Sequence, residues 1–510
     1  MTSSADSGGN FIPGLKSSLI KASAVDYAKI LVGVGILLRA IQFFMNQGLR
    51  EDEGHLIINL VNRNITDILK PLAHVQVAPP LFLLVEKVNL MVFGQNEYAI
   101  RYFAVVSSCL SLIVFYHFLK THTNSYITIM GVGLMALNRH LIFYAVAVKQ
   151  YSSDLLIHLL LISILFTKQD RIRQNKLFLL GVIGTISIWL SHTSLFVLFA
   201  ISVYWLFSLN KLSTLERIKI LIIWIFWGLS FIGLYFATIA NNPNQAPMAT
   251  YWSEHFMPLL PHNVHQFAWF FQHFRDMISF SLGFSNKHYV LWVPFGISFF
   301  AGIIYFIKQK KYQLLLLLIT LITHLIVSGL SKYPFYHRLI LYQTFPLFLF
   351  IAGGFFFMVS SGAKLFDSKR VIGIAVALIL ITQLVITLTN FPYPTEDMKK
   401  DLAILKSNFK VGDKVYVYYP VDGVFDFYKT KYIPAGTPVF YGTESRSNFS
   451  NYEKQITPLT GRVWFIFSHL YTNPSGVAED DYIIQCAKKR GEVLLSGKSY
   501  SASVYLMDLN

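Results

Sequence analysis

Long apolar segments recur from about Tyr27 to Asn390, and several exceed the roughly 20 residues that a helix needs to cross a bilayer. Hydrophobic residues make up 54% of the 510 residues and charged residues only 14%, which is unlike a soluble globular chain. Gly, Phe and Leu are spread around every face of these segments, which excludes amphipathic helices lying on a surface. The fold class we predict is therefore mainly α: a polytopic helical membrane protein.

We expect about 11 spans, with the count least certain where one long segment is interrupted. The segments lie near 27–45, 99–119, 126–148, 152–166, 177–209, 218–240, 289–307, 312–330, 339–359 and 371–389. Segment 177–209 is too long for one helix and is broken by Ser191-His192-Thr193-Ser194, so it counts as two. Between the first two spans, 55–62 and 81–93 are too short to cross and predict interfacial helices.

Basic loops give the chain a predicted orientation. The loops 168–176, 211–219, 308–311 and 364–370 are rich in Lys and Arg and all fall on the same side as the N-terminus. By the positive-inside rule this side is cytoplasmic. The polar tail 1–26 lacks the apolar core of a signal peptide and is expected in the cytoplasm. The loops 48–98 and 241–288 and everything from 391 onward then face outward, in the periplasm if this is a bacterial inner membrane.

The segment 391–510 predicts a small external α/β domain, separate from the membrane domain 27–390. Runs beginning at Val415, Val463, Val493 and Ser503 read as buried strands, and 395–408 and 476–490 as helices. Its tyrosines, Tyr416, Tyr418, Tyr419 and Tyr428, can stack on sugars or pack in a core. No Walker or GxGxxG motif occurs, and two cysteines, Cys109 and Cys486, imply no disulfide framework. We expect no cofactor.

Three consecutive carboxylates, Glu51, Asp52 and Glu53, stand where the first span leaves the membrane. Acidic groups are costly beside hydrocarbon, which favours a functional role. The alternative is that Asp52 caps a following helix with Glu53 in its first turn.

Motifs after these acids carry a resemblance to a known family. The Asp-Glu pair is followed by Pro79-Pro80 and then by Phe93-Gly94-x-x-Glu97-x-x-x-Arg101, which opens the second span. In order and spacing these motifs resemble the GT-C glycosyltransferases related to protein O-mannosyltransferases and the lipid A aminoarabinose transferase. The resemblance covers roughly residues 27–390 and is clearest over the first 160.

The resemblance implies sugar transfer from a polyprenyl-phosphate donor at the outer face of the membrane. The Asp of the pair, here Asp52, would be the general base of an inverting transfer, with Glu53 orienting Asp52 or the acceptor. A second family Asp matches Asp154, which opens the fourth span; the alternative is a helix cap. His55, Tyr151, His192 and Tyr342 are expected to line the substrate cavity, although a packed histidine is the commoner role for His192.

One departure from the family concerns the carrier phosphate. Ala78 stands before Pro79 where the aminoarabinose transferases have a phosphate-binding lysine. Other cations must then neutralise the phosphate, which is already anionic and needs charge-assisted partners. The candidates are Arg338, Lys332, Lys149 and Arg101. We favour Arg338, which opens a span on the outer side, over a side chain that merely snorkels to lipid headgroups.

The loop 241–288 contains His255, His262, His265 and His273 without the spacing of a recognised zinc site, so we expect no metal. Its aromatic residues Trp252, Trp269, Phe270 and Phe271 predict an amphipathic lid. Alternative functions are a lipid-linked glycan flippase or transporter, or a glycan polymerase. The charges near span ends, away from the midplane, argue against a transporter. Expected partners are the lipid-linked donor, a lipid, glycan or protein acceptor, and membrane lipids; the net charge of +16 does not imply nucleic acid.

Overall fold

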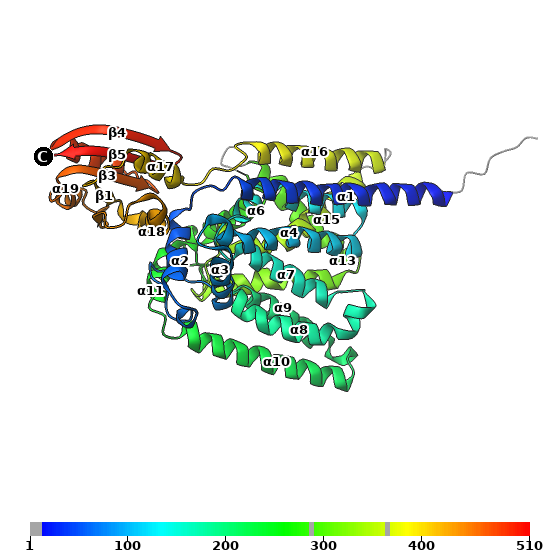
Figure 1. Ribbon diagram of the computed structural model, residues 1–510. Coiled ribbons are helices and arrows are strands. Elements are labelled where there is room, and N and C mark those ends of the chain that lie inside the picture. Colours follow the sequence, from blue (N-terminus) through cyan, green and yellow to red (C-terminus); the bar gives the residue numbers. More distant parts are fainter. Residues whose placement is uncertain (1–12, 285–289, 363–367) are drawn as a thin grey trace, which may run out of the picture.

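The computed structural model describes residues 13–284, 290–362 and 368–510, and shows a bundle of helices with a small sheet domain beside one end (Figure 1). The helices of the bundle half are α1 (Pro13–Phe44), α2 (Glu51–Asn62), α3 (Pro80–Phe93), α4 (Glu97–His122), α5 (Ser125–Ala136), α6 (Arg139–Tyr144), α7 (Tyr151–Leu165), α8 (Asp170–Leu190), α9 (Ser194–Ser208), α10 (Thr214–Leu234), α11 (Gln245–Tyr251), α12 (Val264–Ser281), α13 (Trp292–Lys308), α14 (Leu316–Gly329), α15 (Thr344–Gly362) and α16 (Ser368–Leu388).

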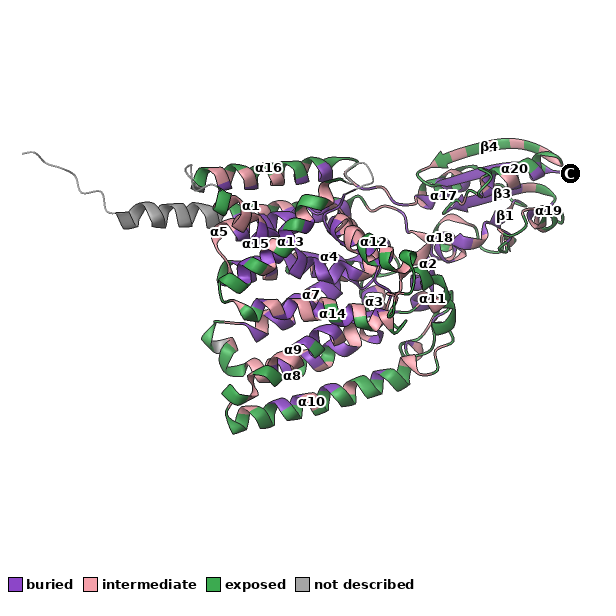
Figure 2. Cartoon of the chain, turned by 180° about the vertical axis from the view of Figure 1, so that it is seen from behind, coloured by how far each residue is buried: buried purple, intermediate pink, exposed green. Residues whose placement is uncertain are grey.

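Seven of the described helical segments are long and apolar enough to cross a membrane, and α5, α7 and α13 are shorter apolar helices. The chain is a multi-pass membrane protein, as predicted, with a span count that is approximate. Figure 2 shows that much of α10 is exposed, and the exposed residues of this helix include the apolar Leu221, Ile225 and Leu229. Such a surface suits lipid and not water.

Three helix boundaries differ from the sequence prediction. Helix α8 begins at Asp170, so most of the predicted basic loop 168–176 belongs to the first turns of this helix. The expected span 126–148 is two helices, α5 and α6, because the Asn138 side chain caps α6 by accepting the Leu141 N–H at 2.8 Å. The first helix begins at Pro13, well before the expected start near 27, and proline is favoured at a first helical position. Residues 1–12 of the predicted tail, and most of the basic loop 364–370, lie outside the described residues.

The break predicted at Ser191-His192-Thr193-Ser194 is confirmed, because α8 ends at Leu190 and α9 begins at Ser194. The Ser194 hydroxyl donates to the carbonyls of Ser187 and Ser191, which also accept the N–H groups of Ser191 and Ser194, so the backbone at the interruption is hydrogen-bonded. The predicted interfacial helices are also present, as α2 and α3.

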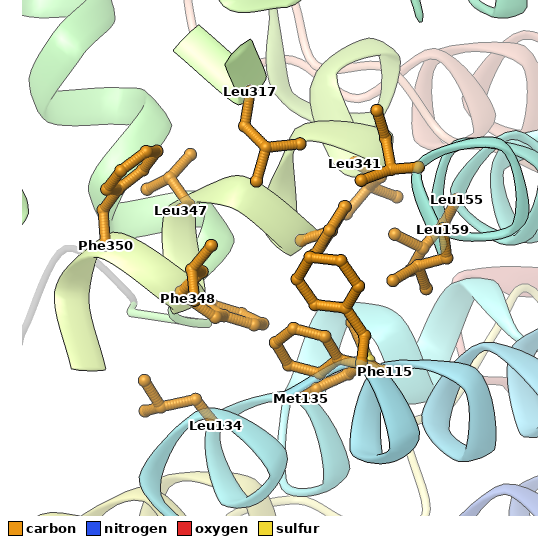
Figure 3. Packing of buried hydrophobic residues seen from close by; sticks show 14 of the residues in the cluster. Phe115, Leu134, Met135, Leu155, Leu159, Leu317, Leu341, Leu347, Phe348 and Phe350 are labelled. Carbon is orange, nitrogen blue, oxygen red and sulfur yellow. The ribbon is translucent and has the colours of Figure 1, made fainter. Parts of the chain in front are cut away.

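The interior of the bundle is a continuous apolar core. Figure 3 shows Phe115 of α4 and Met135 of α5 packing towards Leu155 of α7 and Phe348 of α15. All four side chains are buried. Because these helices pack side by side along their length, their ends are held at fixed positions, and one shared end carries the candidate site.

The basic loops lie at the end of α4 opposite to its start. Lys168 donates to the Thr121 carbonyl and Lys311 to the His122 carbonyl, at the C-terminal end of this helix. Glu97, at the other end, pairs with Lys399 of the sheet domain at 2.9 Å. A helix of 26 residues is about 39 Å long, so these loops and the sheet domain lie at opposite ends of the bundle.

The C-terminal domain consists of α17 (Met398–Asn408), β1 (Lys414–Val417), α18 (Asp422–Tyr432), β2 (Val439–Tyr441), α19 (Ser450–Ile456), β3 (Gly461–Ser468), α20 (Glu479–Lys488), β4 (Gly491–Ser499) and β5 (Ala502–Leu509). The strand order is β2-β1-β3-β5-β4, with β1 parallel to β2 and β3 and the pairs β3–β5 and β4–β5 antiparallel. The four predicted strands and two predicted helices are present. The short elements β2, α18 and α19 were not predicted.

Three of the tyrosines singled out in this domain, Tyr416, Tyr418 and Tyr428, are buried, so they pack in its core and do not present a face for sugar stacking. Tyr419 is partly exposed, and the Arg446 guanidinium lies 5.3 Å from its ring centroid. The alternative of a packing role therefore holds for the buried three.

The sheet domain is bound closely to the end of the bundle. The Thr395 hydroxyl donates to the Gly48 carbonyl at 2.9 Å, and the Glu51 N–H donates to Glu396 at 3.1 Å. The Tyr428 hydroxyl donates to Glu97 at 3.2 Å. Two of these bonds hold the segment that leads into α2, so the domain supports the first turn of that helix.

A buried acid in this domain predicts a pH-dependent stability. Burial raises the pKa of Asp401 to about 7, although the Ser499 hydroxyl donates to it at 3.0 Å. Above the ordinary pKa of 3.8 the unfolded chain has lost the proton of Asp401, whereas the folded protein still holds it. The free energy of unfolding therefore decreases as pH rises through about 7. We expect thermal unfolding at a lower temperature at pH 8 than at pH 5, and a weaker dependence in Asp401→Asn. Burial also raises the pKa of Glu479 to about 7, so this acid contributes to the pH dependence of stability that remains in the variant. A variant with the unchanged slope would contradict this assignment.

Candidate active site

Asp52 lies in the first turn of α2 but does not cap it. The capping position is Arg50, whose N–H donates to Glu53 at 3.0 Å, and Asp52 is the second helical residue. The alternative that Asp52 is an N-cap is therefore wrong. One of its carboxylate oxygens, Oδ2, is buried and accepts no hydrogen bond from the described residues. This leaves that oxygen without a hydrogen-bond donor in the free protein.

Cations surround the Asp52 carboxylate. The Arg50 guanidinium lies 3.5 Å from Oδ1, and the Arg338 guanidinium 3.8 Å from Oδ2. Burial by itself would raise the pKa of Asp52, but the charges of Arg50, Lys149 and Arg338 outweigh it and hold the pKa well below its usual range. Asp52 is thus ionised at neutral pH, in a site with an excess of positive charge.

Glu53 fixes the position of these groups. Its Oε2 accepts the Arg50 N–H, and its Oε1 accepts the Val148 N–H at 2.8 Å. Lys149, the next residue, donates to Gln76 at 2.7 Å. Since a buried carboxylate with two backbone donors is held firmly, Glu53 joins the start of α2 to the segment before α7. The geometry makes it a positioning residue for Arg50 and Lys149.

A cavity of about 400 Å³ adjoins the cluster, and Arg338 belongs to both. Its lining consists of Tyr144, Tyr251, Trp252, His255, Tyr336, His337 and Arg338. Arg338 is the second residue of a 3₁₀ segment, His337–Gln343, ahead of α15, and its guanidinium lies 5.7 Å from the Trp252 ring centroid. The wall is thus aromatic with one strong cation, which suits a ring-shaped polar molecule that carries an anionic group.

Asp154 is also not a cap, since Gln150 occupies the capping position of α7 and Asp154 is the fourth helical residue, within the first turn. It is buried and interacts with Ser191 at the break between α8 and α9, while its Oδ1 has no partner among the described residues. In this part of the chain no charge interaction joins Asp154 to Asp52. Each acid has its own partners, Arg50 and Arg338 for Asp52 and Ser191 for Asp154.

The other residues proposed for the cavity are divided between the cluster and the surrounding structure. Tyr151 interacts with Asp52 and Arg338. Tyr342 is buried and its hydroxyl bonds to His324 at 2.9 Å. His192 lines a separate small cavity of about 30 Å³ with Ala78. His55 faces the sheet domain, 3.0 Å from Asp422.

Two of the proposed phosphate ligands lie elsewhere. Lys332 is exposed, whereas Arg101 is buried and donates to the carbonyls of Gln47 and Gly48 at 2.7 and 3.0 Å. Both terminal nitrogens of Arg101 are occupied by the backbone that leads from α1 into α2. This geometry argues for a positioning role and against a phosphate contact.

Arg101→Ala should therefore act through stability. It leaves two buried carbonyls without their charged donor, and we expect a loss of about 2–4 kcal/mol in the free energy of unfolding. Thermal unfolding in nanodiscs measures this loss. In the fraction that stays folded, affinity for a polyprenyl phosphate should be unchanged; a large loss of affinity without a loss of stability would make Arg101 a phosphate ligand.

The loop 241–288 forms α11 and α12 within its described part. Trp252 and Trp269 are buried while Phe270 and Phe271 are exposed, which is the amphipathic pattern expected of a lid. Its histidines do not form a group of three close ligand atoms among the described residues. His255 instead stacks on Tyr336, with ring centroids 3.6 Å apart.

Several site residues were not predicted from the sequence, above all Arg50, Tyr144, Gln76 and Tyr336. Arg50 had a signal, because a basic residue directly before three acids favours a local ion pair. The cavity-lining tyrosines had none, since aromatic residues at the ends of membrane helices are common.

No family model matches the sequence, and no curated protein matches it with significance. Solved structures do match. Apo ArnT from Cupriavidus metallidurans aligns with a TM-score of 0.56 and 11% identity, over 95% of this chain and 98% of that one. The chain shares its fold with ArnT. ArnT from the same organism bound to undecaprenyl phosphate gives a TM-score of 0.56 and 10% identity, over 94% and 98% of the two chains.

The match to ArnT confirms, at the level of the fold, the resemblance to GT-C membrane glycosyltransferases that the motifs around Asp52 indicated. It extends over the sheet domain as well as the helical bundle, because nearly the whole of both chains is covered.

Proposed function

We propose that this chain is an integral membrane glycosyltransferase that moves a sugar from a polyprenyl-phosphate donor to an acceptor hydroxyl with inversion. The observation that carries the proposal is the ionised Asp52 between Arg50 and Arg338, beside an aromatic cavity that Arg338 also lines. The shared fold of ArnT bound to undecaprenyl phosphate supports a lipid-phosphate partner.

In the proposed reaction the acceptor oxygen attacks the anomeric carbon on the face opposite the phosphate. The bond between that carbon and the phosphate oxygen breaks, and polyprenyl phosphate leaves with the electron pair. Asp52 accepts the acceptor proton as general base. Arg338, Arg50 and Lys149 stabilise the negative charge on the leaving phosphate. Lys149 uses one donor on Gln76 and retains two for a phosphate.

The charge around Asp52 also explains how a carboxylate with a low pKa can act as a base. In the free protein the neighbouring cations make it a weak base. A bound carrier phosphate offsets those positive charges, which raises the basicity of Asp52 when the donor is present. The base is then strengthened by its own substrate. The pH profile of kcat/KM, which reports free enzyme, should extend to lower pH than the profile of kcat.

Two further acids complete the proposed site. Glu53 positions Asp52 through Arg50 and the start of α2, and Asp154 binds a hydroxyl of the sugar or acceptor through its unpartnered oxygen. We place the donor at the outer face of a bacterial inner membrane, with the N-terminus cytoplasmic and the sheet domain periplasmic. The four predicted basic loops support this orientation.

The test uses purified protein in nanodiscs with a panel of radiolabelled polyprenyl-phosphate monosaccharides. One donor should be consumed with release of polyprenyl phosphate, and the product should have the opposite anomeric configuration. Proteoliposomes are the matched experiment for a flippase. Movement of the intact lipid across sealed vesicles without bond cleavage would overturn the proposal.

A further inference from the structure

A second cluster of polar side chains lies where the sheet domain meets α2, and it comes from three separate segments. His55 belongs to α2, His74 to the loop before α3, and Asp422 opens α18. His55 Nε2 lies 3.0 Å from Asp422 Oδ1, and His74 Nδ1 lies 3.8 Å from Asp422 Oδ2. One ligand atom from each residue lies within 4.8 Å of the other two. The two imidazole rings are parallel, with centroids 4.3 Å apart.

Both ring nitrogens of His55 face carboxylate oxygens. Nδ1 lies 2.9 Å from Glu51 Oε1, and Nε2 lies 3.0 Å from Asp422 Oδ1. A neutral imidazole has one N–H, so it can donate to only one of these carboxylates. The other contact would bring two lone pairs together unless a cation lies between them. That cation is either a second proton on the ring or a metal ion.

The backbone brings the three segments together at a conformational cost. His74 and Val75 both have left-handed φ values, 56° and 52°, and a β-branched valine strongly disfavours that region. A Cβ on Gly423 would lie 2.9 Å from the backbone of Gly54, so glycine is needed where α18 meets α2. Strain that persists in two consecutive residues is more common at ligand sites than elsewhere.

We propose that His55, His74 and Asp422 bind one divalent transition-metal ion of the zinc class. Two imidazoles and one carboxylate are ligands that zinc accepts, whereas calcium and magnesium prefer oxygen alone. Ligand atoms around a tetrahedral zinc lie about 3.3–3.5 Å apart, since each bond is about 2.0–2.1 Å. His55 Nε2 lies 3.0 Å from one oxygen of Asp422 and His74 Nδ1 lies 3.8 Å from the other, and both distances are within about 0.5 Å of that value. Glu51 accepts the Nδ1–H of His55, the arrangement that orients a metal-bound imidazole.

The ion would join the sheet domain to the two segments that position the cluster around Asp52. His55 lies in the same helix as Asp52, and His74 is two residues before Gln76, the acceptor of Lys149. His74 and Asp422 side chains are 32% and 30% exposed, so an ion reaches the site from solvent. The site is structural, and it does not depend on the proposed sugar transfer.

The experiment measures zinc in the full-length protein, purified through a tag without histidines. The protein is stripped with a chelator, reloaded with zinc, desalted and analysed by inductively coupled plasma mass spectrometry. Wild type should retain one zinc per chain, and His74→Ala and Asp422→Asn should lose it. His265→Ala, an exposed histidine of α12, is the matched control and should retain it. Zinc should raise the unfolding temperature of wild type and not that of His74→Ala.

X-ray absorption at the zinc edge of wild type identifies the ligands without any substitution. We expect two imidazole nitrogens and one carboxylate oxygen at about 2.0–2.1 Å. The proposal is overturned if reloaded wild type retains no zinc, in which case His55 is an imidazolium between two carboxylates. It is equally overturned if folded His74→Ala and Asp422→Asn retain the ion, or if the absorption spectrum shows sulfur or oxygen ligands alone.

Discussion

Asp52→Asn should abolish sugar transfer while the protein stays folded and binds its donor. The substitution preserves the size of the side chain and removes the group that accepts the proton, so we expect kcat to fall by about 10²–10⁴-fold. Affinity for a polyprenyl phosphate should be unchanged or higher, because Arg50 and Arg338 lose a competing carboxylate. Single-turnover transfer and equilibrium binding of the carrier lipid, both in nanodiscs, measure the two effects separately.

The matched control is Asp170→Asn, the same change in the first turn of α8, where the side chain is 81% exposed. It should leave transfer and stability unchanged, because an exposed ion pair with Arg173 contributes little. If Asp52→Asn kept near-normal turnover, Asp52 would be a structural acid and another group would have to serve as the base.

Arg338→Ala should weaken donor binding more than it slows the chemistry of bound donor. Losing a charge-assisted contact to phosphate costs about 1.5–3 kcal/mol, or roughly ten- to a hundredfold in affinity. The same substitution removes one of the cations that hold the pKa of Asp52 low. The acid limb of kcat/KM should therefore move to higher pH, which a side chain that only snorkels to lipid would not cause.

Lys332→Ala is the control, since Lys332 is an exposed cation in the loop before Arg338. It should change neither the affinity nor the pH profile. Arg338→Lys retains the charge without the planar fork of donors, and its affinity should lie between those of wild type and Arg338→Ala. Donor affinity unchanged in Arg338→Ala would remove Arg338 from the proposed phosphate site.

Much of the fold follows from local sequence. The apolar segments identified a multi-pass helical protein, the polar residues at 191–194 identified the break between α8 and α9, and alternating or buried runs identified four of five strands. These features depend on hydropathy and periodicity over fewer than about 25 residues. Such local patterns form the same helix or strand whatever its neighbours in the folded structure are. The prediction failed at Asn138, where one capping side chain divides an apolar run in two.

The candidate site was predictable only in part. Asp52 was recognisable because it lies among three acidic residues directly after an apolar segment. Arg338 was recognisable because it lies at the start of a predicted span. The contact between Asp52 and Arg338 was not predictable from the sequence, and neither was the donation of the Arg101 guanidinium to backbone carbonyls. Both contacts join residues that are far apart in the chain. The same holds for His55, which was expected to line the substrate cavity and instead contacts Asp422 of the sheet domain.

Hydropathy and charge along the chain are enough to give the class of the protein and the position of its first acidic turn, because the bilayer constrains each span separately and acidic groups beside it are rare. Which charges meet depends instead on the packing of the folded chain. Arg50, Asp52 and Arg338 converge because the packed bundle holds the ends of distant helices together. His55, His74 and Asp422 converge because the sheet domain folds back onto α2. Electrostatic interactions act over a few ångströms in space regardless of separation along the chain, and packing alone sets those distances.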